Sequence, residues 1–316
     1  MKYSVKASTL SLAGLNVLER PGKVIERVAA AGYSGIELKT DAGGFDQVAV
    51  KEIIKVCGSI GMELHTLGGS WAAWDAGEER DLASCDENVR ENALAYSRMS
   101  IDLTADLGSG IFEVCAAPGQ TAYPRSKTPI GLLRDNFIRS IREMCDYASD
   151  RNVAIAIEPI NRYEGHPGFM NSVVDAMDVI DEAGCTNLGV LVDLFHANIE
   201  DTSVAGAIRA SEGRLLNVHL CDSNRDAPGT GHINFLEVME ALQTIGYKGF
   251  LSIGFVPSVL DVNRLQATLF ETSISYLQEL ERQGIVLGPC GTTSILVPST
   301  DRGSRGPQGK KDSGLE

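Results

Sequence analysis

Short apolar segments alternate with longer amphipathic segments along most of the chain, and the alternation repeats about eight times. The short segments predict buried strands, and the longer ones have the apolar spacing of helices. The predicted strands are Tyr3–Ala7, Gly35–Lys39, Met62–Leu67, Gly110–Ala116, Val153–Ile160, Leu188–His196, Leu215–Asp222 and Phe250–Phe255. The predicted helices are Val24–Ala31, Gln47–Ile60, Glu87–Leu107, Ile130–Ser149, Ser172–Ala183, Thr202–Ser211, Phe235–Ile245 and Val259–Arg282.

This order of elements indicates an α/β protein with a single (β/α)8 TIM barrel, a fold of usually about 250 residues. A doubly wound open sheet is the competing arrangement, but no GxGxxG motif follows the first predicted strand. We therefore expect one barrel domain over residues 1–283. Residues 284–316 are rich in Gly, Ser, Thr and Pro, which predicts a flexible, disordered C-terminal tail.

The net charge of −14 argues against nonspecific contact with nucleic acid or an anionic membrane, because both require a basic surface. The seven cysteines include no CxxC pair, which favours reduced thiols over a disulfide framework. No apolar run approaches the roughly 20 residues of a membrane span, and the first residues lack a convincing secretory signal. These features predict a cytoplasmic protein with neither nucleic acid nor membrane as a partner.

The segment VAIAIEPINRYE (153–164) places a carboxylate at the end of an apolar strand. In an extended strand Ala154, Ala156 and Glu158 point to the same face. A carboxylate at the end of a strand that is buried on both faces needs a partner, which is either a cationic side chain or a metal ion. The alternative is a carboxylate at the strand end that faces solvent.

The next two predicted strands each bring a possible metal ligand to the same depth in the barrel. These ligands are Asp193 and His219, and the eighth strand offers only Gly254 there. Active sites of such barrels form at the C-terminal ends of the strands. Two carboxylates and an imidazole suit Mg²⁺, Mn²⁺ or Co²⁺, whereas zinc more often recruits additional His or Cys. The pattern predicts a divalent metal site formed by Glu158, Asp193 and His219.

Two longer connections follow the third and fourth predicted strands, and both leave this same face of the barrel. The first, Gly68–Glu87, carries Trp71 and Trp74, and the second is Ala117–Pro129. The two tryptophans either form an apolar wall over a small ligand or pack the loop onto the barrel rim.

Four segments also carry a resemblance to a known family. They are IEPINRYE (157–164), VDLFHANIED (192–201), VHLCDSNRDAPGTGHINF (218–235) and GYKGFLSIGFVPS (246–258). With them, residues 1–282 resemble the D-tagatose/D-psicose (allulose) 3-epimerase group of the sugar-phosphate isomerase/epimerase superfamily, whose barrels are xylose-isomerase-like. The resemblance implies a sugar substrate and a homodimer or homotetramer.

In that group the positions of Glu158, Asp193 and His219 hold the metal ion. The resemblance implies Mn²⁺ first, with Co²⁺ or Mg²⁺ as alternatives, and gives Glu158 the further role of catalytic base. The chain departs from the group at Gly254, where the family has a glutamate that acts as fourth metal ligand and second acid/base. The carboxylates considered as substitutes are those on the second, third and fourth predicted strands: Glu37, Glu63 and Glu113.

Three further positions match residues that contact the sugar in that group: Glu164, His196 and Arg225. Each also has a plain structural interpretation. Glu164 could pair with Arg162 within its loop, Arg225 could pair with Asp226 at the surface, and His196 could form a hydrogen bond within the barrel rim.

Together these features predict a metal-dependent ketose 3-epimerase, acting on a D-tagatose, D-psicose or D-fructose type of sugar through an enediolate. Inversion at carbon uses two acid/base groups, so we expect Gly254 to impair it. One alternative is an aldose–ketose isomerase with Glu158 as sole base, because same-face proton transfer needs only one. Others are a dehydratase or a noncatalytic relative that binds sugar or metal. A nuclease resembling endonuclease IV is disfavoured by the net charge and the few histidines.

Overall fold

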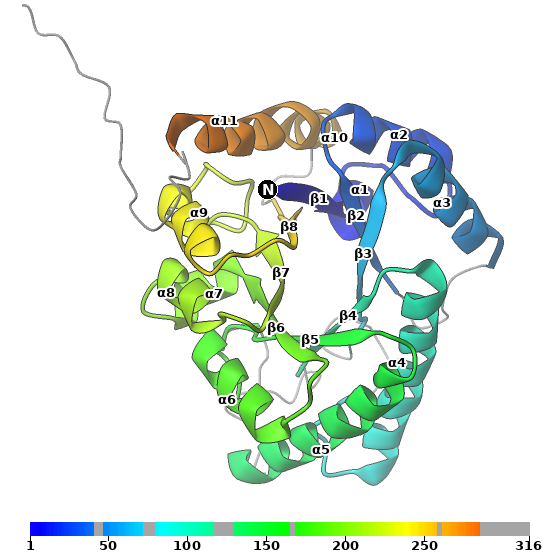
Figure 1. Ribbon diagram of the computed structural model, residues 1–316, viewed down its shortest axis with the longest axis vertical. Helices are drawn as coiled ribbons and strands as arrows, with labels where there is room; N and C mark the ends of the chain where they lie inside the picture. The colour runs from blue at the N-terminus through cyan, green and yellow to red at the C-terminus, as the bar shows by residue number, and fades with distance from the viewer. Residues whose placement is uncertain (41–46, 72–79, 117–128, 165–167, 258–260, 285–316) are drawn as a thin grey trace, which may run out of the picture.

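The computed structural model describes residues 1–40, 47–71, 80–116, 129–164, 168–257 and 261–284. Eight parallel strands close into a barrel in the order β1 to β8, and helices surround them (Figure 1). The strands are β1 (Lys2–Lys6), β2 (Gly35–Lys39), β3 (Glu63–Gly68), β4 (Ile111–Cys115), β5 (Ala154–Glu158), β6 (Leu188–Asp193), β7 (Leu215–Leu220) and β8 (Phe250–Ile253). The predicted (β/α)8 barrel is confirmed.

The helices that lie outside the barrel follow the strands in turn. They are α1 (Ala7–Leu12), α2 (Pro21–Ala30), α3 (Gln47–Ile60), α4 (Glu87–Leu107), α5 (Ile130–Ser149), α6 (Val173–Ala183), α7 (Leu194–Glu200), α8 (Val204–Ala210), α9 (Phe235–Thr244), α10 (Val262–Ala267) and α11 (Ile274–Gly284). A π-helical segment, η1 (Thr268–Ser273), joins α10 to α11, so the helix predicted as a single unit from residue 259 has a wider turn in its middle.

The prediction for the sixth strand was wrong at its C-terminal end. The strand ends at Asp193, and α7 begins at the next residue, so His196 lies on a helix rather than on a strand. Asp193 causes this switch because its Oδ1 accepts the backbone N–H of Phe195 at 2.8 Å, which caps the first turn of the helix.

The parallel register brings charged residues together at the C-terminal ends of the strands. Lys6 lies beside Glu37 across β1 and β2, and Asp193 lies beside His219 across β6 and β7. Residues at the same height of a barrel point into the same layer of its interior. The strand ends therefore form a layer rich in ionisable groups.

Below this layer the barrel interior is polar rather than filled only by branched apolar residues. The Oγ of Ser4 lies 2.8 Å from the Oγ of Ser252 and 2.8 Å from Nε2 of His65. Ser252 in turn donates to the side-chain oxygen of Asn217 at 3.3 Å. These buried side chains form a hydrogen-bonded column that leads up to the charged layer.

Trp71 packs the loop after β3 onto the barrel, in agreement with the second of the two interpretations. Its ring is fully buried and meets Tyr96 edge-on at 5.4 Å between ring centroids, with Phe112 at 6.2 Å. Trp74 and the predicted tail at 285–316 lie outside the described residues.

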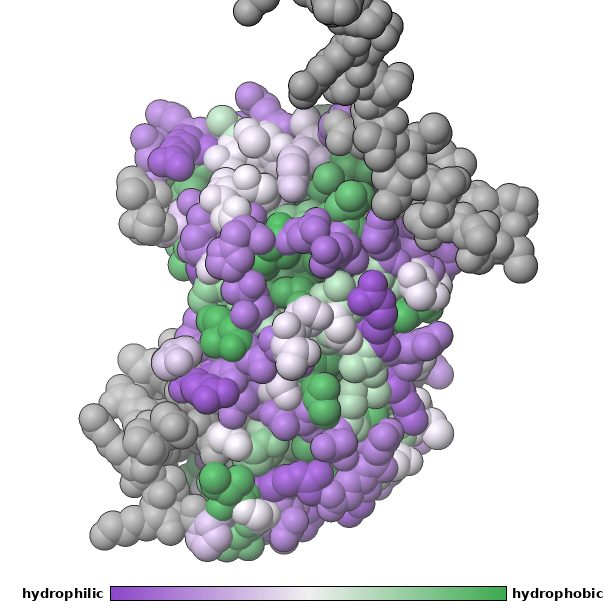
Figure 2. All heavy atoms as spheres, turned by 90° about the vertical axis from the view of Figure 1, so that its left-hand side faces the viewer, coloured by the Kyte–Doolittle hydropathy of each residue, from purple (hydrophilic) through white to green (hydrophobic). Residues whose placement is uncertain are grey.

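On the side of the molecule that carries α6 to α9, hydrophilic residues are interspersed with separate apolar ones (Figure 2). Among the described residues, no helix has the length and apolar character needed to cross a membrane.

Candidate active site

The C-terminal ends of the strands enclose a cavity of about 180 Å³, which suits a ligand smaller than a typical drug molecule. Its ionisable lining residues are Lys6, Glu37, Lys39, Glu113, Glu158, Asp193, His196 and Arg225. Gly254 lines the same cavity. Of the predicted residues, Glu158, Asp193, His196 and Arg225 line this cavity. His219 and Glu164 do not line it, but they contact Glu158 and Arg225 respectively.

Glu158 ends β5 and is almost fully buried, with 5% of its surface exposed. Its Oε1 lies 3.2 Å from Nδ1 of His219, and its Oε2 accepts the thiol proton of Cys115 at 3.3 Å. Burial raises the pKa of this carboxyl group, but the hydrogen bond and charge of His219 outweigh burial and hold the pKa well below its usual range. Glu158 is therefore ionised at neutral pH.

His219 is fully buried at the end of β7 and lies between three carboxylates. Its Nδ1 is 3.2 Å from Glu158 and 3.8 Å from Asp193, and its Nε2 is 3.0 Å from Oε1 of Glu37. Burial lowers the pKa of His219, but the Glu37 charge outweighs burial and raises the pKa to about 10.

Asp193 serves two purposes with its two oxygens. Oδ1 caps α7 and also accepts the thiol proton of Cys221 at 3.5 Å, whereas Oδ2 faces the cavity, 3.8 Å from Nη1 of Arg225. Burial raises the pKa of Asp193, but the nearby His196 and Arg225 lower it overall.

Two of the three carboxylates considered as substitutes reach the site. Glu37 is buried against His219 and accepts a side-chain N–H of Asn217 at 2.8 Å. Glu113 lines the cavity, and burial together with the Glu158 charge raises the pKa of Glu113 to about 8. Glu63 instead lies at the opposite end of its strand, where it pairs with Lys2 at 2.9 Å.

The sequence patterns missed Lys6, which extends from the end of β1 into the cavity. Its Nζ lies 3.0 Å from Nδ1 of His219 and 3.4 Å from Oε1 of Glu37. Burial lowers the pKa of Lys6, but Glu37, Glu113 and the other carboxylates outweigh burial and raise it, so the amine is charged. The available signal was its position, in phase with the buried Ser4 at the C-terminal end of the first strand.

Arg225, Glu164 and His196 lie together at the edge of the cavity. Arg225 donates from Nη2 to Oε2 of Glu164 at 3.2 Å, and its Nη1 is 3.3 Å from Nε2 of His196. Its guanidinium also stacks over the ring of Phe195, with 4.5 Å between Cζ and the ring centroid. Glu164 thus pairs with Arg225, while Arg162 pairs with Glu200 at 2.5 Å.

Arg225 is held in the left-handed region, with φ of 64°, by the loop that follows β7. Asp222 organises this loop: its carboxylate accepts backbone N–H groups of Ser223, Gly229 and Ile233 at 2.7 to 3.1 Å. The backbone N–H of Arg225 donates to the carbonyl oxygen of Asp222 at 2.9 Å. A loop with these bonds presents Arg225 to the cavity at a defined position.

Three sets of buried side chains bring ligand atoms within 4.8 Å of one another, as a metal site requires. They are Glu37, Glu113 and His219; Glu113, Cys115 and Glu158; and Glu158, Asp193 and His196.

The predicted set, Glu158, Asp193 and His219, meets an obstacle. A metal ion there would need Nδ1 of His219 at about 2.0–2.2 Å, yet Nζ of Lys6 already lies 3.0 Å from that atom. The side chains as they lie do not fit a divalent ion at this point.

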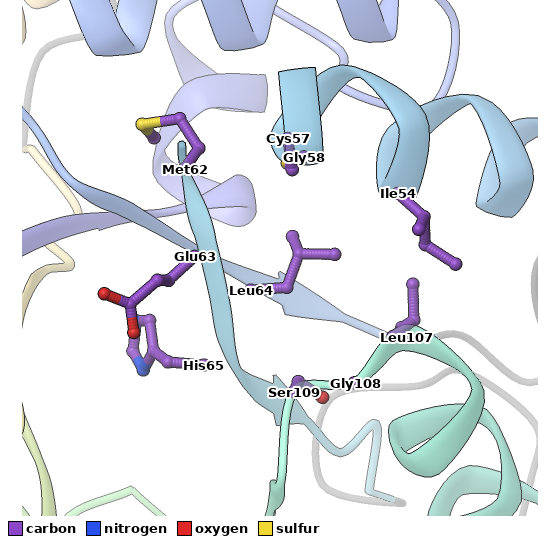
Figure 3. Close-up of a pocket in the computed structure, with 10 residues that line it drawn as sticks. All are labelled: Ile54, Cys57, Gly58, Met62, Glu63, Leu64, His65, Leu107, Gly108 and Ser109. Atoms are coloured by element: carbon purple, nitrogen blue, oxygen red, sulfur yellow. The ribbon is translucent and has the colours of Figure 1, made fainter. Parts of the chain in front are cut away.

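Another cavity, of about 320 Å³, lies at the opposite end of β3 (Figure 3). Ile54, Leu64 and Leu107 face one another across it, whereas Glu63 and His65 lie on the other side of the strand (Figure 3). The residues that line this cavity do not converge as a catalytic group, so it offers no chemistry comparable to that of the first cavity.

A closed (β/α)8 barrel with a charged cavity at the C-terminal ends of its strands has the architecture of a barrel enzyme. The chain belongs to the Xylose isomerase-like TIM barrel family, whose pattern matches residues 25–280. The xylose-isomerase-like barrel superfamily that the four sequence segments indicated is thereby confirmed.

Several characterised proteins are similar to this chain. An L-ribulose 3-epimerase of Methylomonas sp. is 28% identical over 252 residues, which cover 78% of this chain and 82% of that protein. A D-psicose 3-epimerase of Enterocloster bolteae is 38% identical over 116 residues, covering 37% of this chain and 38% of its own length. The crystal structure of D-psicose 3-epimerase with D-tagatose, from Clostridium cellulolyticum H10, superposes with a TM-score of 0.76 at 23% identity. The superposition covers 89% of this chain and 99% of the epimerase chain.

Proposed function

We propose that this protein is an isomerase of carbohydrates that moves a proton next to the carbonyl group of a ketose, with Glu158 as the base. The observation that carries the proposal is an ionised, buried carboxylate at the end of β5 that lines a small polar cavity. Relatives with ketose 3-epimerase activity support the same class of reaction.

In this proposal Glu164, His196 and Arg225 bind the sugar. Arg225 offers donors to the hydroxyl or carbonyl oxygens, and Glu164 and His196 fix its guanidinium at the cavity edge. The stacking of Arg225 on Phe195 further restricts its orientation. This arrangement reduces the ordering cost when a sugar binds.

The proposed reaction is C3 epimerisation of a ketose of the D-tagatose, D-psicose or D-fructose type, at a reduced rate. Inversion requires a proton donor on the face opposite to the base, and Gly254 provides no acid/base side chain on β8. Assembly into a homodimer or homotetramer is part of the same proposal, and sedimentation velocity tests it.

One observation favours aldose–ketose isomerisation as a second candidate. Oxygen atoms of Glu113 and Glu158 lie within 4.8 Å of each other on adjacent strands, so both groups approach the substrate from one side. The pKa of Glu113 is raised to about 8 while that of Glu158 is lowered, which suits an acid and a base respectively. Same-face proton transfer between neighbouring carbons can use such a pair.

Mn²⁺ held by Glu158, Asp193 and His219 was expected from the sequence. No step of the proposed mechanism passes through it, because Lys6 lies where the ion would bind.

The test is exchange of substrate hydrogen with D2O across a panel of ketoses and aldoses, followed by NMR. We expect exchange by the wild type, and a loss of about 10²–10⁴-fold in Glu158→Gln. Glu63→Gln, the same change in an exposed side chain at the other end of the barrel, is the matched control. Sugar binding without exchange in the wild type would instead identify a noncatalytic relative. The C3-inverted or aldose product decides between the two reactions.

A further inference from the structure

Lys6 and Gly254 have complementary shapes at the mouth of the barrel. A Cβ added at Gly254 would overlap Cδ of Lys6 and would lie 3.2 Å from its Cγ. The stem of the lysine thus fills the volume that a side chain at 254 would occupy. In the conformation that it adopts here, Lys6 therefore uses the space left free by the glycine that follows β8.

The amine of Lys6 lies in the centre of the charged layer. It is 3.0 Å from Nδ1 of His219 and 3.4 Å from Oε1 of Glu37. Two other carboxylates, Glu158 and Asp193, contact the same ring nitrogen of His219, at 3.2 and 3.8 Å. Buried carboxylates that lie this close together need positive charge among them, and Lys6 supplies part of it from within the chain.

We propose that the Lys6 ammonium is the resident cation of this site and takes the place of a divalent metal ion between His219 and the carboxylates. The site then needs no metal for its charge balance. Because Lys6 also lines the cavity, its N–H groups can reach an oxygen of a bound ligand.

Lys6 acquires a catalytic role if the proposed isomerisation is correct, and this second half of the inference rests on that function. Glu158 takes the proton from the carbon next to the carbonyl group. The electron pair of the broken C–H bond forms a C=C bond, and the carbonyl π electrons move onto the oxygen. The Lys6 ammonium donates a hydrogen bond to this oxygen. The proton of the neighbouring hydroxyl group passes to this oxygen, and Glu158 returns the abstracted proton to the former carbonyl carbon, so that the hydroxyl-bearing carbon becomes the new carbonyl group. Fixed donors aimed at such developing charge stabilise the transition state.

The first experiment measures Mn²⁺ binding by calorimetry on EDTA-treated protein and is independent of activity. We expect no saturable binding by the wild type, and binding of one Mn²⁺ by the double variant Lys6→Ala with Gly254→Glu. That variant removes the ammonium and places a carboxylate in the vacated volume. Lys6→Ala alone should show saturable Mn²⁺ binding, at least tenfold tighter than the weakest affinity that the wild-type measurement would have detected.

Lys2→Met is the matched control, because Lys2 is an exposed lysine at the opposite end of the same strand, β1, where it pairs with Glu63. It should behave as the wild type. Circular dichroism confirms that each variant is folded. The proposal is overturned if the wild type binds one Mn²⁺ that Asp193→Asn abolishes, or if Lys6→Ala leaves Mn²⁺ affinity unchanged.

The second experiment follows hydrogen exchange of a ketose in D2O with EDTA present. We expect the wild type to keep its full rate, Lys6→Met to lose about 10²-fold or more, and Lys2→Met to lose none. A wild type that exchanges only after Mn²⁺ is added contradicts the catalytic role of Lys6. If no sugar exchanges under any condition, the proposed function fails, and the Mn²⁺ measurements still decide whether Lys6 is the resident cation.

Discussion

The carboxylate of Glu37 lies against Nε2 of His219, with its two oxygens at 3.0 and 3.1 Å. A side-chain N–H of Asn217 donates to the same carboxylate at 2.8 Å, so Glu37 is fixed from two sides. The pair orients the imidazole whose other nitrogen faces Glu158 and Lys6. A buried carboxylate of this kind sets which protons the ring carries.

We therefore expect Glu37→Gln to lower the pKa of His219 from about 10, because the neighbouring negative charge is lost. NMR titration of the ring protons measures this change. The raised pKa of His219 contributes stability fully below pH 6.5, and this contribution is lost as the pH rises through about 10. Glu37→Gln should thus cost about 3–5 kcal/mol in the lower range and less above it. A His219 titration unchanged from the wild type would contradict the pairing.

The hydrogen-bonded column beneath the site includes His65, and we expect this residue to make the stability of the protein depend on pH in a second range. Burial lowers the pKa of His65 from 6.5 to about 4. The unfolded chain takes up this proton below pH 6.5 and the folded protein does not, so stability falls as the pH drops from 6.5 to 4. The loss attributable to His65 is about 3 kcal/mol. Urea denaturation at several pH values should show a smaller loss in His65→Gln than in the wild type.

We expect changes in the loop after β7 to weaken substrate binding more than they slow catalysis. Asp222→Ala removes the acceptor of three backbone N–H groups and frees the loop that presents Arg225. Gly231→Ala should act similarly, because its Cβ would overlap Oδ1 of Asp222. Steady-state kinetics should show a KM raised about tenfold or more with a smaller change in kcat. A fall in kcat alone would mean that the loop serves catalysis directly.

The barrel wall predicts opposite effects for two glycine substitutions. A Cβ at Gly189 in β6 would overlap the carbonyl oxygen of Arg214, so Gly189→Ala should destabilise the protein by about 1–3 kcal/mol. At Gly58 in α3 nothing lies within 4 Å of an added Cβ, so Gly58→Ala should stabilise by about 0.5–1 kcal/mol. Urea denaturation compares both variants with the wild type. Equal effects of the two would contradict the packing of β6 against the segment before β7.

Much of the fold was predictable because hydrophobic periodicity reports burial directly. The predicted bounds of Gly35–Lys39, Gln47–Ile60 and Ile130–Ser149 agree with β2, α3 and α5. Helix α7 was missed because LFHANIE continues an apolar strand without a glycine or proline break. Only the side chain of Asp193, acting as a cap, ends the strand there.

The site was less accessible to sequence reasoning than the fold. Glu158 and Asp193 stand out in the sequence because each is a carboxylate at the end of an apolar strand. In the sequence Lys6 looks like any lysine on the surface. Only the closed barrel, in which β1 pairs with β8, shows that it lies beside Gly254. Contacts across the closure depend on three-dimensional register, which no local pattern encodes.

Asp193 ends a strand and caps a helix with no residue between them. The chain has no slack at this point, so an insertion or deletion on either side would rotate the carboxylate away from the cavity. New specificities on this scaffold must therefore arise from changes elsewhere around the cavity. The junction between β6 and α7 must keep its length for Asp193 to stay in the cavity.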